Sequence, residues 1–323
     1  MDLSNDSDGS VLFYLPTEKA EALKEKYLKN PKLIKLDHGA IKVVRSLLKK
    51  KNQVGDLKTT LLFLEQAFKS PNNSQIFMVF HKVLDIHMSV PEFFNNNEIV
   101  YCSEQDFIIK AWGPILSEIF KQAKLTLRWG DTTMENTTAP FKVDLRVICT
   151  INGDRYDVGF VEFAKNFTAS KAQKDRVKLI LEGKEALNTV FKVIGKYVPD
   201  IEFYTLQIAG LKGHLISTTL QSNGLYTAQN INNRIRFPLT NNDIFDQTSH
   251  LMKAIIKFKA QCLKINDVLE KALAIKNQER LSFETVLDKS AKKKYRSQPL
   301  PLSVIKVPGY CTPLWLEEGY EDE

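Results

Sequence analysis

Hydrophobic positions along this chain of 323 residues recur at two spacings, and the change between them divides the chain. Up to about residue 120, apolar side chains recur every three or four residues, which predicts amphipathic helices. From about residue 125 they alternate with polar side chains, as in half-buried strands. We therefore expect a helical region first and a sheet after it.

Residues 15–100 are predicted to form a mainly helical N-terminal region, preceded by a polar tail, 1–14, whose composition predicts disorder. The next helix begins near Ser103, a predicted N-cap that is followed by acidic residues. Pro114 falls inside this helix and is expected to kink or divide it, because proline cannot donate a helical hydrogen bond.

Residues 101–240 are predicted to form an α/β core. Alternation is clearest over 141–151, where Asp144 lies on the polar face of the predicted strand. Asn152-Gly153 is the strongest hairpin signal in the chain, so we expect 155–163 to return beside the first strand. A long amphipathic helix over 170–197 and three further strands follow.

This order of elements predicts the α/β (α+β) class, with a mixed central sheet flanked by helices. Residues 241–290 are expected to form a C-terminal helix that packs on the core, and 291–323 a basic and then acidic tail. No apolar run approaches the roughly 20 residues that cross a bilayer, so we expect no membrane association.

The net charge of +7 and the basic run at 292–296 permit a polyanionic partner and suggest nuclear import. No secretory signal is visible at the N-terminus. We therefore expect an intracellular protein, with the nucleus favoured over the cytoplasm. The four cysteines are far apart and form no C-x-x-C pair, so we expect neither a disulfide partner nor a zinc site.

Common catalytic signatures are absent from the sequence: there is no nucleophile elbow, phosphate-binding loop, dinucleotide fingerprint or H-E-x-x-H motif. One constellation of carboxylates remains. Asp144 lies within one predicted strand and Glu162 near the end of its predicted partner, and buried carboxylates are costly unless they are paired, hydrogen-bonded or bound to metal. Two carboxylates that meet across a hairpin can hold Mg²⁺ (or Mn²⁺), which prefers oxygen ligands.

The register of the hairpin decides whether these carboxylates meet. A two-residue turn at Asn152-Gly153 pairs Ile151 with Asp154, which leaves Asp144 and Glu162 pointing to opposite faces. A three-residue loop or a single β-bulge shifts the pairing by one residue and places the two carboxylates opposite each other. The sequence leaves both registers open.

Over about residues 103–235, the chain resembles the PD-(D/E)XK nuclease superfamily. The shared order is a helix, three strands, a long helix and a strand, with Asp on the second strand and Glu on the third. Within this superfamily, the chain resembles an uncharacterised family of mucoralean fungal proteins. The segments that carry the resemblance are Asp106-Phe107 with Lys110, Trp112 and Pro114, then Leu127-Arg128-Trp129-Gly130-Asp131, Val143-Asp144-Leu145, Val161-Glu162-Phe163-Ala164-Lys165 and Lys174-Asp175-Arg176-Val177-Lys178-Leu179.

The resemblance implies a restriction-endonuclease-like core and a metal-dependent hydrolase that cleaves DNA or RNA as an endonuclease or exonuclease. Asp144, Glu162 and Lys165 would be its catalytic residues, and Glu118 would join Asp144 and Glu162 as a third metal ligand. The chain departs from the superfamily pattern at Ala164, where a lysine is expected.

The missing lysine has several possible replacements. Lys165 comes one residue late, and strand alternation points it away from Glu162 unless a bulge intervenes. Lys171 or Lys174, at the start of the following helix, would be migrated replacements. Lys171, Lys174 and Lys178 recur at helical spacing and form a candidate basic stripe for contacting nucleic-acid phosphates.

Two other interpretations remain open. In the first, the chain is a degenerate nuclease fold that binds nucleic acid or protein, which Ala164 favours. In the second, it is a structural α/β protein whose carboxylates pair with Arg146 and Lys142.

Overall fold

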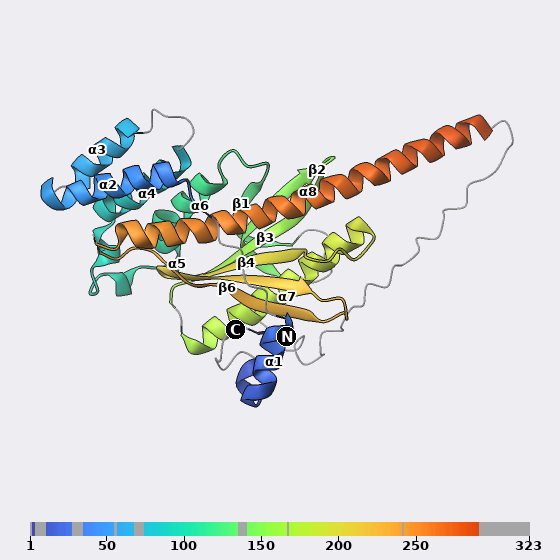
Figure 1. The fold of residues 1–323 in the computed structure, drawn as a ribbon, viewed down its shortest axis with the longest axis horizontal. Coiled ribbons are helices and arrows are strands. Elements are labelled where there is room, and N and C mark those ends of the chain that lie inside the picture. Colours follow the sequence, from blue (N-terminus) through green and yellow to red (C-terminus); the bar gives the residue numbers. More distant parts are fainter. Residues whose placement is uncertain are drawn as a thin grey trace.

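The computed structural model describes residues 2–3, 11–27, 35–54, 57–67, 74–134, 141–166, 168–240 and 242–290. A mixed six-stranded sheet with helices on both faces forms its centre, as the sequence predicts (Figure 1). The strands are β1 (Thr126–Thr133), β2 (Lys142–Ile151), β3 (Asp154–Ala164), β4 (Glu202–Ala209), β5 (Lys212–Leu220) and β6 (Tyr226–Arg236).

The strands follow chain order across the sheet, and all neighbouring pairs are antiparallel except β3 and β4. Because parallel neighbours need a long crossover, the 26-residue helix α7 (Ala169–Ile194) connects this pair. The carboxyl ends of β3 and β4 therefore lie side by side, at the edge of the sheet where α7 begins.

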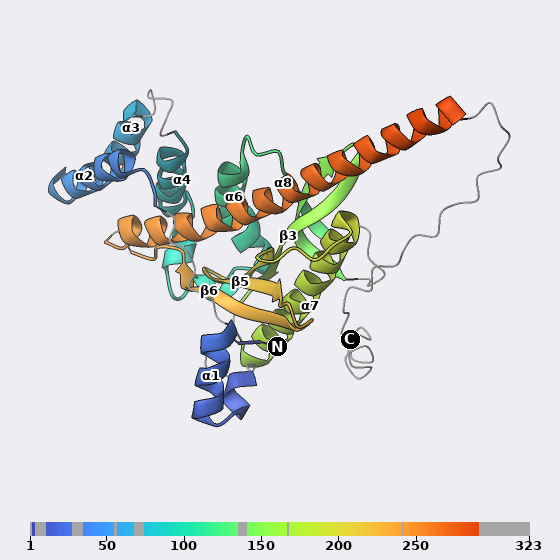
Figure 2. The same cartoon turned by 45° about the vertical axis from the view of Figure 1, so that its right-hand side comes forward.

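Two long helices cover opposite faces of the sheet (Figures 1 and 2). Residues of β3 show which helix lies on which face. A Cβ atom on Gly159 would lie 2.7 Å from side-chain atoms of Phe258 and Cys262 on α8 (Ile244–Ser290), whereas Glu162 forms an ion pair with Lys178 on α7. The segment expected at 241–290 as a helix on the core is therefore α8, which crosses the sheet.

The N-terminal helices are α1 (Thr17–Tyr27), α2 (His38–Val54), α3 (Leu57–Ala67) and α4 (Ser74–Ser89), with short 3-10 turns at Val11–Tyr14, Pro91–Phe94 and Ile99–Tyr101. Helices α2–α4 are grouped at one end of the molecule (Figure 2). Val44, Leu64 and Phe80 belong to the same buried cluster as the sheet residues, so α2–α4 share the core of the sheet, whereas Ala20 of α1 packs in a separate small cluster.

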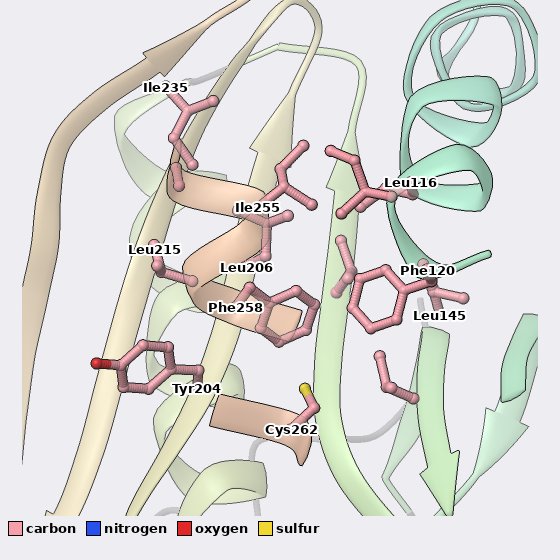
Figure 3. Packing of buried hydrophobic residues seen from close by; sticks show 14 of the residues in the cluster. Leu116, Phe120, Leu145, Tyr204, Leu206, Leu215, Ile235, Ile255, Phe258 and Cys262 are labelled. Atoms are coloured by element: carbon pink, nitrogen blue, oxygen red, sulfur yellow. The ribbon is translucent and has the colours of Figure 1, made fainter. Parts of the chain in front are cut away.

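The centre of the core lies between the sheet and α8 (Figure 3). Phe258 and Cys262 of α8 pack there against strand residues such as Leu145 and Leu206, and Phe120 approaches from the neighbouring helix (Figure 3). All of these side chains are almost completely buried. The apolar face of the β2–β3 hairpin is thus covered by α8, and its polar face is turned toward α7.

The helix before the sheet contains a widened turn. It runs through α5 (Glu104–Asp106), a π-helical segment, η5 (Phe107–Trp112), and α6 (Gly113–Phe120). Pro114, the residue expected to kink or divide this helix, lies in the first turn of α6, directly after the π-helical segment. A Cβ at Gly113 would lie 2.7 Å from the carbonyl oxygen of Ile108, so the close approach within this turn requires glycine. Such π-turns are frequent at functional sites.

Part of the tail expected to be disordered is placed against the sheet. The N–H of Leu3 donates to the carbonyl of Ala228 on β6, and the side chain of Leu3 is buried. Asp2 pairs with Arg176 of α7 through both carboxylate oxygens, at 2.6 and 3.1 Å. The basic run at 292–296, on which the nuclear prediction depends, lies outside the described residues.

None of the described helices combines the length and the apolarity that a membrane span requires. The three described cysteines, Cys102, Cys149 and Cys262, are buried and form no disulfide. Burial raises the pKa of Cys149 to about 12, which keeps its thiol protonated.

Candidate functional site

A β-bulge in the β2–β3 hairpin sets the position of the candidate carboxylates. At the turn, Asn152 and Gly153 have φ angles of 54° and 92°, and Ile151 pairs with Asp154, as the two-residue loop predicts. The register then shifts between the pairs formed by Ile148 and Val147, so that Leu145 pairs with Val161.

One further step in this register places Asp144 opposite Glu162. The backbone N–H of Phe163 donates to Oδ2 of Asp144 at 2.7 Å, which fixes that carboxylate against β3. Of the two registers that the sequence leaves open, the structure has the one in which both carboxylates share a face.

Glu162 forms the centre of the site. Its side chain lies between the sheet and α7 and is 7% exposed. Nζ of Lys178, on α7, donates to Oε1 of Glu162 at 2.9 Å. The same Nζ lies 3.8 Å from Oε1 of Glu182, one helical turn further along α7. One lysine thus faces two buried glutamates.

Glu182 is the most unusual of these carboxylates. It is completely buried, and neither of its oxygens has a hydrogen-bond partner among the described residues. Most buried polar side-chain atoms in proteins are hydrogen-bonded, and each exception calls for a physical reason, such as a catalytic role or a bound ion or water. We call Asp144, Glu162, Lys178 and Glu182 the carboxylate cluster.

The charge of the carboxylate cluster is unbalanced. Burial, and next the charge of Asp144, raise the pKa of Glu162 from 4.5 to about 8, although Lys178 opposes the shift. Burial and the charge of Glu162 raise the pKa of Glu182 well above its usual value. Burial alone would lower the pKa of Lys178, but the charges of Glu162 and Glu182 outweigh it and the pKa is raised.

These shifts conflict with a simple ion pair, because the 2.9 Å contact suggests an ionised Glu162 whereas its raised pKa favours the protonated form. The charge count explains the conflict. Three ionised carboxylates around one lysine would leave an excess of negative charge in a buried site, so the cluster holds protons near neutral pH.

Two further carboxylates lie around the cluster. Burial is the main cause that raises the pKa of Asp175, on α7, and of Glu104, at the start of α5, and the charge of Asp144 adds to both shifts. Nζ of Lys171 lies 3.6 Å from Oε2 of Glu104 and stabilises its charge. The acidic character therefore extends from α7 to the beginning of α5.

The side chains of the carboxylate cluster include the oxygen ligands that Mg²⁺ prefers, but they do not form a complete set of protein ligands. Among the described residues, no three His, Cys, Asp or Glu side chains are grouped as metal ligands. Mg²⁺ is usually held by one or two carboxylates, with waters and substrate phosphates completing its shell. Asp144 and Glu162 meet that smaller requirement. The oxygens of Glu182 have no hydrogen-bond partner among the described residues, so they could accept hydrogen bonds from waters beside a bound ion.

A pocket of about 460 Å³ opens beside Asp144. The α5–η5–α6 helix forms one wall, at its π-turn, and β1 forms the other with Trp129 and Gly130. A volume of this size is in the range of small-molecule sites. Asp144 therefore borders this open pocket as well as belonging to the buried cluster.

Apart from Lys178, the other predicted site residues lie outside the cluster. Nζ of Lys165 donates to the carbonyl of Val100 at 2.9 Å, and its side chain is exposed. Glu118 on α6 lies 3.8 Å from Lys121, and its charge is not among those that shift the pKa values of Asp175, Glu162 or Glu182. Within the predicted basic stripe, Lys174 is exposed, while Lys171 and Lys178 face carboxylates.

Sequence reasoning missed Glu182, although the pattern contains a signal for it. Leu179, Glu182, Ala186 and Val190 recur at helical spacing, and all four are buried. An acid at an apolar position of a helix is unusual enough to mark a candidate site. The contact of Lys178 with Glu162 carried no comparable signal, because Glu162 lies on another element.

Comparisons with known proteins give no match to any protein family, curated protein or solved structure.

Proposed function

We propose that this protein is a Mg²⁺- or Mn²⁺-dependent nuclease that hydrolyses phosphodiester bonds in DNA or RNA. The observation that carries the proposal is the bulge in the β2–β3 hairpin, since it places Asp144 and Glu162 on one face beside Lys178. The element order α6–β1–β2–β3–α7–β4 is the one that the resemblance to PD-(D/E)XK nucleases leads us to expect.

Three residues of the cluster have roles in this proposal. Asp144 and Glu162 would hold the metal ion, which supplies charge neutralisation at the phosphodiester and lowers the pKa of a bound water. Glu162 would lose its proton as it becomes a ligand. Lys178 would then turn its Nζ from Glu162 to the charge that develops on the phosphate, and so replace the lysine that is missing at Ala164.

A second candidate function is supported by the same contact. The Nζ of Lys178 already donates to Oε1 of Glu162, at the place where a metal ion would bind. In addition, Ala164 stands where the superfamily pattern has a lysine. A degenerate nuclease fold that binds nucleic acid, or another protein, without cleaving it would keep this arrangement.

Metal binding tests the proposal. We expect calorimetry to detect Mg²⁺ or Mn²⁺ binding to the full chain and to show that Asp144→Asn and Glu162→Gln each abolish it. Glu118→Gln is the matched control, because it removes a half-buried carboxylate outside the cluster. Unchanged metal affinity in the Asp144 and Glu162 variants, with both proteins folded, would reject the shared site.

The metal affinity is also expected to depend on pH. Metal ligands must be deprotonated, and the pKa of Glu162 is raised to about 8, so affinity should increase as the pH rises from 6 to 8. Titrations in two buffers of different ionisation enthalpy measure the protons released at each pH. Binding without proton release at pH 6 would contradict the role of Glu162 as a ligand.

Hydrolysis separates the two candidate functions. Single- and double-stranded DNA and RNA would be incubated with wild-type protein and with Lys178→Met in the presence of Mg²⁺. The nuclease proposal expects cleavage by the wild type and at least about a hundredfold loss in Lys178→Met, which is the cost of removing one group that stabilises transition-state charge. Nucleic-acid binding without cleavage would favour the degenerate fold.

A further inference from the structure

The pocket beside Asp144 has a chemistry that differs from that of the carboxylate cluster. Its helical wall presents the apolar side chains Ile108, Ile109 and Pro114, and β1 contributes the indole of Trp129. Ile109 is 67% exposed although it is apolar, so this wall reaches the surface. The walls suit a flat, uncharged group rather than an ion.

The position of Trp129 is fixed from two sides. Its ring stacks on Phe163 of β3, with ring centroids 6.1 Å apart and an angle of 29° between the planes. The π-turn brings the helix close on another side, where a Cβ on Gly113 would lie 3.8 Å from the Trp129 ring. A ring held in this way offers a preformed stacking surface to a ligand.

Polar groups are placed sparingly in the pocket. Gln105 and Ser117 line the helical wall, and both side chains can donate as well as accept hydrogen bonds. Among the described residues that line it there is no lysine, arginine or histidine, and the charged one is Asp144. A phosphate or another anion would therefore meet repulsion there, whereas a heteroaromatic ring with polar edges would find both stacking and hydrogen-bonding partners.

We propose that this pocket binds an unpaired nucleobase next to the phosphodiester held at Asp144, and that the substrates are single-stranded nucleic acids or single-stranded ends. This inference rests on the proposed function, because it takes the phosphate position from the candidate metal ligands. Asp144 belongs to both the pocket and the cluster, so one nucleotide can place its phosphate at the carboxylates and its base against Trp129.

The requirement for an unpaired base follows from the shape of the pocket. Trp129 on β1 and the apolar side chains on the helix line the same pocket, so a ring that enters it contacts both the indole and the helix. A base within a duplex is already stacked on both sides and paired along its edge. It would have to leave the helix at an energetic cost, whereas a single-stranded base enters without unpairing.

Binding is tested separately from cleavage. Fluorescently labelled oligothymidylate, the same oligonucleotide with one abasic position, and a duplex of equal length would be titrated with the full chain. Fluorescence anisotropy would be measured with Ca²⁺ and again with a chelator. The variants are Trp129→Ala, Trp129→Phe, which keeps an aromatic ring, and Phe63→Ala on α3 as a control for an exposed aromatic side chain elsewhere.

We expect the single strand to bind at least about tenfold more tightly than the duplex, and Trp129→Ala to lose about tenfold to a hundredfold of that affinity, the range for one base stacked on an aromatic ring. Trp129→Phe should retain most of the affinity, which excludes misfolding as the cause of the loss, and Phe63→Ala should bind as the wild type does.

Equal affinity for single strand and duplex would overturn the inference, as would unchanged affinity in Trp129→Ala. Either result leaves the proposed nuclease untouched if Mg²⁺-dependent cleavage still depends on Asp144. Conversely, base binding that depends on Trp129, without cleavage under any metal condition, would support the pocket and reject the nuclease. Absence of binding to every oligonucleotide would overturn the inference.

Discussion

Two groups of buried charges lie on the β2–β3 hairpin, and they differ in balance. At the bulge, the guanidinium of Arg146 faces the carboxylate of Asp157 as a fork, with Nε to Oδ1 at 2.8 Å and Nη2 to Oδ2 at 3.0 Å. The remaining Nη1 donates to the carbonyl of Thr133. Both side chains are almost completely buried, with one charge of each sign.

The carboxylate cluster lies near the end of the same hairpin and has no such balance. Lys178 is shared between Glu162 and Glu182, at 2.9 and 3.8 Å, and Asp144 adds a third carboxylate. Within the described part of the chain, no hydrogen bond reaches either oxygen of Glu182. Glu162 and Glu182 are buried as deeply as Arg146 and Asp157, while Lys178 and Asp144 are half-buried, and only the pair of Arg146 and Asp157 has matched charges.

The difference separates a structural charge pair from a candidate site. In a buried ion pair with matched charges and good hydrogen bonds, each charge neutralises the other. The pair of Arg146 and Asp157 is therefore stable in the core without a bound ion. A buried group with more carboxylates than basic side chains is stable only if protons or a bound cation supply the missing positive charge. This imbalance is the physical reason to look for function at Glu162 rather than at Asp157.

Breaking the matched pair is expected to have the largest effect on stability. Arg146→Met should lower the free energy of unfolding by about 3–5 kcal/mol, because it leaves Asp157 as an uncompensated buried charge. Urea unfolding measures the change. Arg128→Met on β1 is the control, since Arg128 lies opposite Arg146 in the sheet but is exposed. Equal losses in the two variants would show that the ion pair is not the cause.

The unbalanced cluster is expected to make stability depend on pH. Folding raises the pKa of Glu162 from 4.5 to about 8, so between these values the folded state binds a proton that the unfolded state has lost. The stabilisation is therefore complete below about pH 4.5, falls as the pH rises, and is gone above pH 8.

Comparison with Glu162→Gln isolates this contribution. From pH 6 to pH 8 the wild type should lose up to about 3 kcal/mol more unfolding free energy than the variant, at about 1.4 kcal/mol per pKa unit. Denaturant midpoints at a series of pH values test this. Parallel pH profiles for the two proteins would mean that Glu162 is ionised throughout and that Lys178 balances it.

Replacing Glu182, whose carboxylate has no hydrogen-bond partner among the described residues, is expected to have the smallest effect on stability, and the effect should be stabilising. Glu182→Leu should raise the free energy of unfolding by about 1–2 kcal/mol, because it replaces a buried carboxylate that has no hydrogen bond with an apolar side chain. Glu185→Leu, on the same helix, is the control, since Glu185 accepts a hydrogen bond from Asn188. A loss of stability in Glu182→Leu would place it with Arg146 as a structural charge.

The sequence by itself determined the class of the fold, the order of its elements and the polar face of β2. Alternation over 141–151 placed Asp144 on the opposite face from Val143 and Leu145, and Asn152-Gly153 specified the two-residue turn, because both positions have a positive φ. These features depend on local periodicity and on backbone preference, which are visible within a few residues of the chain.

Only the tertiary structure decided which side chains meet. The bulge sets Asp144 beside Glu162, and it lies where Gly159 lets Phe258 and Cys262 of α8 approach the sheet. The lysine that reaches Glu162 is Lys178, not Lys165, because α7 packs on that face, whereas Lys165 lies beyond the strand and donates to Val100. Register and helix packing are set by contacts between distant segments, and the residues at 144, 162 and 178 carry no local signal of them.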